Sequence, residues 1–296
     1  MLLYACPGNE SRADRLALRL GAQRGDAVWH RFPDGETLVR IDTSPAGERT
    51  WLVCTLAEPD AKILPLLFAA DALREQGAAR VGLVAPYLAY MRQDTQFHPG
   101  EGVSSRYFCA LLAQHFDWLV TVDPHLHRTK QLTEIFEQSN CTVHVAKVLA
   151  EWIRLNVRDP VLIGPDGESA QWVSAVAEIV QAPWTNLTKE RFGDREVRVS
   201  IPDRDILQGR NPVLVDDIIS SGQTLAAAAA QLRAANLPAP VCVAIHGVFA
   251  PGAREALHAA GVARIAVTDT IAQPEAVIDV TPTLAEGVGW LMAGGE

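Results

Sequence analysis

Two neighbouring carboxylates followed by a turn of small hydroxyl residues have the clearest chemical meaning in this chain. Asp216 and Asp217 come directly after the apolar run 213–215. The turn and the start of a helical pattern follow, with the candidate phosphate-binding residues Ser220, Ser221, Gly222, Gln223 and Thr224. Backbone N–H groups at a helix N-terminus bind phosphate, and open α/β sheets bind ligands at the carboxyl ends of their strands. Because carboxylates repel a bare phosphate, the pattern predicts a phosphorylated sugar whose hydroxyls or magnesium ion the acids contact.

Strand and helix patterns alternate along the chain, which is typical of parallel α/β architecture. Apolar runs predict strands at 2–5, 51–55, 81–85, 119–122, 161–163, 213–215, 241–246 and 264–267. Helical patterns lie at 11–20, 61–76, 104–115, 146–156, 168–181, 223–235 and 252–259. We therefore predict an α/β fold of two similar domains, 1–145 and 146–296, each a mostly parallel sheet flanked by helices. The alternating segment 195–201 predicts an exposed β arm.

Length, composition and charge indicate a globular protein with small-molecule ligands. The chain has 296 residues, of which 48% are hydrophobic and 21% charged, and this length favours two domains. A net charge of −9 argues against a surface that coats nucleic acid. The five scattered cysteines form no C-x-x-C pair and predict reduced thiols. With no evident secretory signal or membrane-spanning apolar segment, we expect a cytoplasmic protein without nucleic-acid or membrane partners.

The common phosphate-binding motifs of nucleotide-binding proteins do not occur in the sequence. Neither G-x-x-x-x-G-K-[ST] nor G-x-G-x-x-G is found, so a nucleotide would need another device. In the first half, a turn presents Phe32 beside two acids, Asp34 and Glu36. The Phe32 ring can stack on a purine. Arg92 and Gln93 can contact phosphate oxygens and a base edge, because a guanidinium suits bidentate phosphate contacts.

With these motifs in this order, the chain resembles the ribose-phosphate pyrophosphokinases, also called phosphoribosyl pyrophosphate synthetases. The resemblance runs from the Asp34 turn to about Asp269 and is closest to the archaeal-type branch. It implies two phosphoribosyltransferase-like domains, the first with ATP-side motifs and the second with the sugar site and a catalytic loop. It implies transfer of the β,γ-diphosphoryl group of ATP to O1 of ribose 5-phosphate, which gives phosphoribosyl pyrophosphate and AMP. It also implies a homo-oligomer that shares its ATP site between subunits.

The resemblance further implies roles for individual residues. ATP would be bound by Phe32, Asp34, Glu36, Arg92, Gln93 and Asp94, with the first three reaching a neighbouring subunit's pocket. Ribose 5-phosphate would be bound by Asp216, Asp217, Ser220, Ser221, Gly222, Gln223 and Thr224. Magnesium would be held by His125 and Asp166, and the role of His127 is left open. Lys189 and Arg191, on a mobile loop, would close over the transferring phosphates. Gln223 stands where many family members have glycine, which narrows the freedom of the backbone.

Two alternatives remain open from the sequence. A phosphoribosyltransferase would share the 216–224 segment, but it does not need the segments around Phe32, Arg92 and Lys189. A catalytically silent regulatory homologue would be expected to lose catalytic or metal-binding residues, whereas the candidates for these roles are all present. The altered turn at Gln223 still leaves room for a changed substrate.

Overall fold

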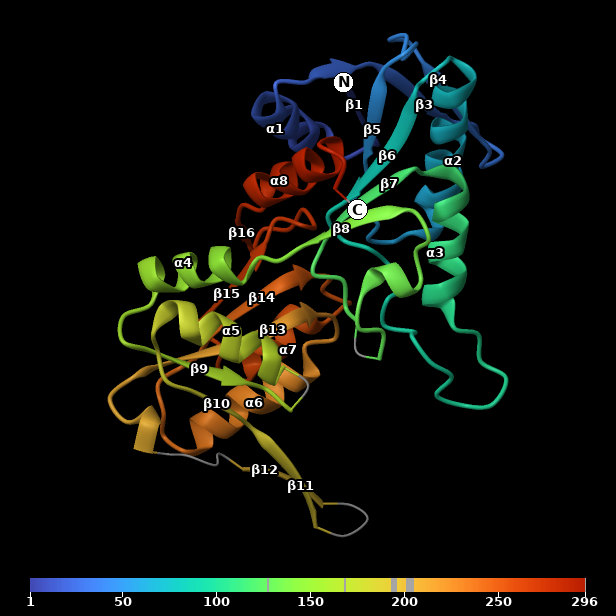
Figure 1. Cartoon of the computed structure of the whole chain (residues 1–296). Coiled ribbons are helices and arrows are strands. Elements are labelled where there is room, and N and C mark those ends of the chain that lie inside the picture. The colour runs from blue at the N-terminus through green and yellow to red at the C-terminus, as the bar shows by residue number, and fades with distance from the viewer. Residues whose placement is uncertain (127, 168, 193–195, 201–204, 296) are drawn as a thin grey trace. The chain divides into compact units, whose positions relative to one another are not determined.

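The computed structural model contains two α/β units, each with its own parallel sheet (Figure 1). One unit comprises Met1–His144 and Thr281–Glu296, and the other comprises Val145–Val280. The structure describes residues 1–126, 128–167, 169–192, 196–200 and 205–295, with the backbone alone over 188–192 and 196–200. The predicted fold class, two units of mostly parallel sheet flanked by helices, is confirmed.

The sheet of the first unit reverses its strand order at one point. Its strands follow the order β2-β1-β5-β6-β7-β8. They are β1 (Leu2–Ala5), β2 (Gln23–Gly25), β5 (Arg49–Val53), β6 (Arg80–Ala85), β7 (Trp118–Val122) and β8 (Ser139–Val143). An antiparallel hairpin of β3 (Ala27–Arg31) and β4 (Thr37–Ile41) lies between β2 and β5 in the sequence. Because the order reverses between β1 and β5, their carboxyl ends form the topological switch point of this sheet.

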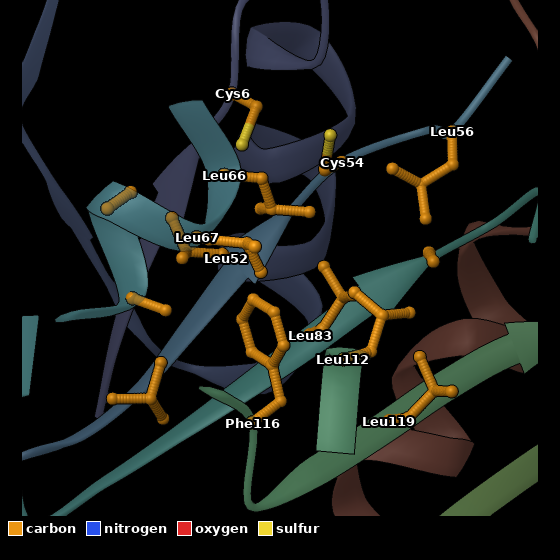
Figure 2. Packing of buried hydrophobic residues seen from close by; sticks show 14 of the residues in the cluster. Cys6, Leu52, Cys54, Leu56, Leu66, Leu67, Leu83, Leu112, Phe116 and Leu119 are labelled. Carbon is orange, nitrogen blue, oxygen red and sulfur yellow. The ribbon is translucent and has the colours of Figure 1, made fainter. Parts of the chain in front are cut away.

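Two pairs of helices cover this sheet on opposite sides (Figure 1). The helices are α1 (Glu10–Leu20), α2 (Asp60–Glu75), α3 (Ser104–His115) and α8 (Thr281–Met292), with a 3-10 turn η1 (Leu132–Glu134). Helix α1 packs with α8, and α2 packs with α3. Strands buried on both faces need apolar residues at successive positions, which explains their continuous apolar runs. Figure 2 shows the leucine-rich core on one side, where Leu52, Leu83, Leu112 and Leu119 surround Phe116.

The last helix belongs to the first unit, although the expected division at residue 145 assigned it to the second. Helix α8 packs against α1, β7 and β8. A Cβ atom on its Gly287 would come within 2.7 Å of the Val143 side chain and 2.9 Å of Val120, so the helix lies very close to the sheet. An apolar helical pattern fits either sheet, and the sequence alone therefore does not assign this helix.

The second unit repeats the strand order of the first. Its sheet order is β10-β9-β13-β14-β15-β16. The strands are β9 (Pro160–Gly164), β10 (Trp184–Asn186), β13 (Asn211–Ile219), β14 (Val241–Gly247), β15 (Arg264–Thr268) and β16 (Ala276–Ile278). The helices are α4 (Ala146–Asn156), α5 (Ala170–Val180), α6 (Gln223–Ala234) and α7 (Ala253–Ala259), with a 3-10 turn η2 (Asp205–Leu207). The switch point of this sheet lies between β9 and β13.

A hairpin arm extends the second unit after β10. Its strands, β11 (Thr188–Phe192) and β12 (Glu196–Ser200), pair antiparallel with each other, and β12 corresponds to the strand predicted at 195–201. Among the helices that the structure describes, none combines the length and the apolar character needed to span a membrane.

Candidate functional site

The predicted strand 213–215 ended before the two neighbouring carboxylates. In the structure, both carboxylates lie inside β13. The strand continues to Ile219, because Ile218 and Ile219 still pair with residues of β14. Successive side chains of a strand point to opposite faces, so Asp216 and Asp217 extend to different sides of the sheet. Asp217 is 6% exposed, whereas Asp216 is half-buried. The two carboxylates therefore lie on different sides of β13, near its carboxyl end.

The turn after β13 is shaped by one glycine. Gly222 has a φ of 70° and forms the N-cap of α6. A Cβ atom at this position would lie 3.3 Å from the carbonyl oxygen of Ala253 and 3.3 Å from Leu257. Both the left-handed backbone and the close approach therefore require glycine. Gln223, by contrast, is the first helical residue and has no positive φ, so its replacement of the usual glycine causes no backbone strain.

Asp166 follows β9 and closes the other side of this switch point. Its Oδ1 accepts a hydrogen bond from the N–H of Ser169 at 3.3 Å, and the Ser169 hydroxyl donates to the carbonyl oxygen of Asp166 at 2.8 Å. These bonds hold the loop at the start of α5. The Asp166 carboxylate is half-buried, and it lies at the same edge of the sheet as the end of β13. The structure thus brings Asp166, the two acids and the turn to one end of one sheet.

The hairpin arm starts beside the same switch point. The N–H of Leu187 donates to the carbonyl oxygen of Gly164 at 2.8 Å, which ties the root of the arm to the end of β9. A Cβ atom on Gly164 would lie 1.9 Å from Oδ1 of Asn186, so only glycine allows this contact. Lys189 and Arg191 lie on β11, two residues apart, and pair with Val199 and Val197. Their side chains lie outside the described residues.

In the first unit, Phe32 lies on the exposed turn of the β3–β4 hairpin. The N–H of Phe32 donates to the carbonyl oxygen of Glu36 at 2.8 Å, and Oδ1 of Asp34 accepts the N–H of Glu36 at 3.1 Å. The Phe32 ring is 38% exposed and meets His30 edge-on at 4.6 Å between ring centroids. Asp34 and Glu36 are exposed as well. The turn is therefore held by its own hydrogen bonds and presents an aromatic ring to solvent.

An open groove of about 640 Å³ lies between this turn and α2. Asp34 and Glu36 line it from the hairpin, and Leu64 and Phe68 line it from the helix. Leu64 is 58% exposed and Phe68 is 47% exposed. The two acids of the turn thus share a surface with two exposed apolar side chains.

The residues 92–94 have three different environments. Arg92 is exposed and forms no hydrogen bond or ion pair with another residue that the structure describes. The side-chain amide of Gln93 donates to the carbonyl oxygen of Thr95 at 3.3 Å and to Glu101 at 3.4 Å. Arg92 is therefore placed to meet a ligand, whereas Gln93 is held within its own loop.

Asp94 is buried and bound by Arg128. Its Oδ1 accepts the Arg128 guanidinium at 2.9 Å, and its Oδ2 accepts the Arg128 N–H at 3.0 Å. Burial acts to raise the pKa of Asp94, but the hydrogen bonds from Arg128 outweigh it and hold the pKa below its ordinary value. The guanidinium also lies 5.4 Å from the ring centroid of Phe97. The Asp94 carboxylate is therefore occupied by Arg128, a residue that the sequence motifs did not single out although it closely follows His125.

The loop after β7 contains a second pair that the sequence did not predict. Asp123 has a φ of 30° and a fully buried side chain, and its Oδ1 lies 2.6 Å from Nδ1 of His144. This hydrogen bond raises the pKa of His144, although burial opposes the shift. His125 lies in the same loop and is half-buried, whereas His127 lies outside the described residues.

The candidate metal ligands fit magnesium unequally. Across the described residues, no group of three or more His, Cys, Asp or Glu side chains is arranged to hold a metal. Magnesium prefers oxygen ligands, keeps several waters and needs only one or two protein carboxylates beside substrate phosphates. The half-buried carboxylate of Asp166 fits this chemistry. The imidazole of His125 fits it less well as a direct ligand and suits a contact to a phosphate oxygen or a water.

Comparisons with known proteins extend over nearly the whole chain. A family model described as the N-terminal domain of ribose phosphate pyrophosphokinase matches residues 1–115, and a phosphoribosyl transferase domain model matches residues 131–279. A ribose-phosphate pyrophosphokinase of Thermococcus kodakarensis is 37% identical over 264 residues, covering 89% of this chain and 92% of that protein. One from Methanopyrus kandleri is 33% identical, covering 97% and 98%. The crystal structure of phosphoribosylpyrophosphate synthetase from Mycobacterium smegmatis matches with a TM-score of 0.86 and 25% identity, covering 99% of each chain.

Proposed function

This chain belongs to the ribose-phosphate pyrophosphokinase family, and we propose that it transfers the β,γ-diphosphoryl group of ATP to O1 of ribose 5-phosphate. The products are phosphoribosyl pyrophosphate and AMP. The predicted family and enzyme type are confirmed. The observation that carries the finer proposal is the second switch point, which gathers Asp166, Asp216, Asp217 and the Gly222 turn at one edge of a sheet. The phosphoribosyltransferase alternative leaves the first unit unexplained. The solved synthetase, by contrast, matches the first unit as well as the second.

Ribose 5-phosphate binds at this second switch point. The 5-phosphate accepts hydrogen bonds from backbone N–H groups of the turn 220–224, where the positive end of the α6 dipole favours an anion. The hydroxyls of Ser220, Ser221 and Thr224 add donors. Asp216 and Asp217 accept hydrogen bonds from the ribose hydroxyls, each from its own side of β13. The sugar hydroxyls are thus bound by hydrogen-bond acceptors, and the phosphate is bound by hydrogen-bond donors.

The reaction is an in-line displacement at the β-phosphorus of ATP. O1 of the ribose forms a bond to this phosphorus and releases its hydroxyl proton to solvent, the bond from the phosphorus to the oxygen bridging to the α-phosphate breaks, and AMP leaves. Little covalent chemistry falls to the protein, so catalysis consists of positioning and electrostatic stabilisation. Lys189 and Arg191 on the arm supply cations for the developing charge on the phosphoryl oxygens. Magnesium, with Asp166 as an oxygen ligand, would neutralise phosphate charge at the same place.

ATP is bound chiefly by residues of the first unit. The exposed Phe32 ring stacks on the adenine, and the exposed Arg92 contacts phosphate oxygens. Arg128, which Asp94 holds in place, is a further cation of the same unit. Asp34 and Glu36 contact the nucleotide from the hairpin turn.

The active enzyme is a homo-oligomer in which the Phe32 turn completes the ATP pocket of a neighbouring subunit. Two observations support this proposal. The turn is exposed and held by its own hydrogen bonds, so it can reach beyond its own unit. The groove beside it exposes Leu64 and Phe68, and apolar side chains grouped on a surface are typical of subunit contacts.

The identity of the nucleotide product tests the proposed reaction. The protein is incubated with ATP, magnesium chloride and ribose 5-phosphate, and the nucleotides are separated by chromatography. AMP in equal amount to phosphoribosyl pyrophosphate is expected. ADP would mean transfer of the γ-phosphoryl group and would refute the diphosphokinase reaction. Folded protein that binds ribose 5-phosphate but forms neither product would favour the catalytically silent homologue.

A further inference from the structure

Two cysteines lie side by side at the switch point of the first sheet. Cys6 follows β1 and Cys54 follows β5, the neighbouring strands between which the strand order reverses. The parallel register pairs Ala5 with Val53, and the N–H of Cys6 donates to the carbonyl oxygen of Val53 at 3.0 Å. Cys6 and Cys54 are therefore the next pair in the same register. Figure 2 shows both side chains at one edge of the core, near Leu66.

The geometry of this pair suits a cross-strand disulfide. Cys6 and Cys54 directly follow the paired residues Ala5 and Val53 on two parallel strands, so their side chains start from neighbouring backbone positions. Neighbouring strands lie about 4.7–4.9 Å apart. This spacing falls within the roughly 4.4–6.8 Å between Cα atoms that a disulfide spans. Because a disulfide also needs its Cβ atoms about 3.5–4.5 Å apart, the ends of the two strands must draw slightly together as the bond forms.

A small hollow gives selective access to the pair. Both cysteines line a cavity of about 220 Å³, together with Trp29, His30 and Lys62. Cys6 is only 4% exposed and Cys54 only 1% exposed. Access to the sulfur atoms is therefore narrow, which favours a reagent as small as hydrogen peroxide over a bulky disulfide.

We infer that Cys6 and Cys54 form a modification site at which hydrogen peroxide converts the two thiols into a disulfide. One thiolate attacks a peroxide oxygen, the O–O bond breaks, and the leaving hydroxide takes up a proton, so that a sulfenic acid and water result. The second thiol attacks the sulfenic sulfur, the S–S bond forms and another water leaves. The thiols lose two electrons and two protons, which the peroxide takes up. Burial raises the pKa of Cys6, so the reaction is slow at neutral pH.

The position of the disulfide can be mapped in the full chain. The protein is treated with hydrogen peroxide, unfolded in urea, alkylated without reductant, digested and analysed by mass spectrometry. We expect a linked peptide pair containing Cys6 and Cys54, which dithiothreitol separates. The oxidised protein should also unfold at a higher temperature than the reduced protein, because the link constrains the unfolded chain.

Control variants show whether the site is specific. Cys6→Ser and Cys54→Ser should each abolish the link, whereas Cys242→Ser, at a cysteine that is equally buried, should leave it unchanged. If the serine variants fail to fold, the peptide map of the unaltered chain still shows whether Cys6 and Cys54 are linked. Separate alkylation of Cys6 and Cys54 after peroxide treatment would overturn the inference. Oxidation of either residue to a sulfinic acid without the link, or a link through the less buried Cys141 alone, would overturn it as well.

Discussion

Replacing Phe32 with alanine removes the ring that we expect to stack on adenine. Stacking of a base on an aromatic ring contributes about 1–3 kcal/mol. Because about 1.4 kcal/mol corresponds to a tenfold change in affinity, the KM for ATP should rise roughly 5- to 150-fold. The ring is 38% exposed and has its aromatic contact with His30 on the same hairpin. The free energy of unfolding should therefore change by only about 0.5 kcal/mol.

The assay measures AMP formation against ATP concentration at saturating ribose 5-phosphate. Tyr107→Ala is a matched control, because Tyr107 is a 65% exposed aromatic residue of the first unit, on α3 and away from the hairpin. Its KM for ATP should stay at the wild-type value. A Phe32→Ala enzyme with an unchanged KM for ATP would refute the stacking role. An equal rise of the KM in the control variant would show that the effect of Phe32→Ala is not specific to stacking.

The same variant tests whether subunits share the ATP site. Phe32→Ala protein, assayed at an ATP concentration far below its KM, is mixed with inactive Lys189→Ala protein under conditions that exchange subunits. A mixed oligomer contains pockets with the intact Phe32 of one chain and the intact Lys189 of another, so part of the activity should return. If labelled subunits exchange and no activity returns, or if dilute monomer is fully active, the pocket is not shared.

Four further substitutions test the second unit and the Asp94 ion pair. Lys189→Ala should lower kcat and kcat/KM together by several orders of magnitude in steady-state assays, because it removes a contact made only in the transition state; near-normal turnover would make Lys189 a surface charge. Asp217→Asn should weaken ribose 5-phosphate binding, measured by calorimetry, more than ATP binding, and equal weakening would contradict the assignment of the sugar site. Gly222→Ala should lower the free energy of unfolding in urea by about 1–2 kcal/mol, because it forces a side chain into the left-handed region; an unchanged value would show that the turn relaxes. Asp94→Asn should destabilise the protein at neutral pH, because the pKa of Asp94 is depressed in the folded state. A carboxyl group whose pKa is depressed in the folded state stabilises that state at a pH above its unfolded pKa of about 3.9. This contribution to stability is lost as pH falls through the folded pKa. The difference from wild type in urea unfolding should thus shrink below about pH 4, and a difference independent of pH would disagree with the Arg128 ion pair.

Local patterns were enough to predict most of the regular structure. The expected strands 2–5 and 119–122 correspond to β1 and β7, because strands buried on both faces need apolar residues at successive positions. The expected helices 104–115 and 146–156 coincide with α3 and α4. The β3–β4 hairpin was missed as a pair of strands, because its half-exposed residues lack such a run. The order of the motifs was also local information, and it was sufficient to identify the family.

The sequence by itself therefore determined the fold class, the family and the set of chemical groups at the site. Tertiary structure alone decided where these groups lie and which side chains they contact. Asp94, which we predicted to bind ATP, is buried against Arg128, 34 residues away, and the sequence did not indicate this ion pair. Asp216 and Asp217 looked like one pair of ligands, but the continuation of β13 along β14 sends them to opposite faces. The place of helix α8 and the neighbouring positions of Cys6 and Cys54 likewise depend on distant partners. A pattern of residue types records local preference and burial, whereas pairing depends on which distant segments the sheet brings together.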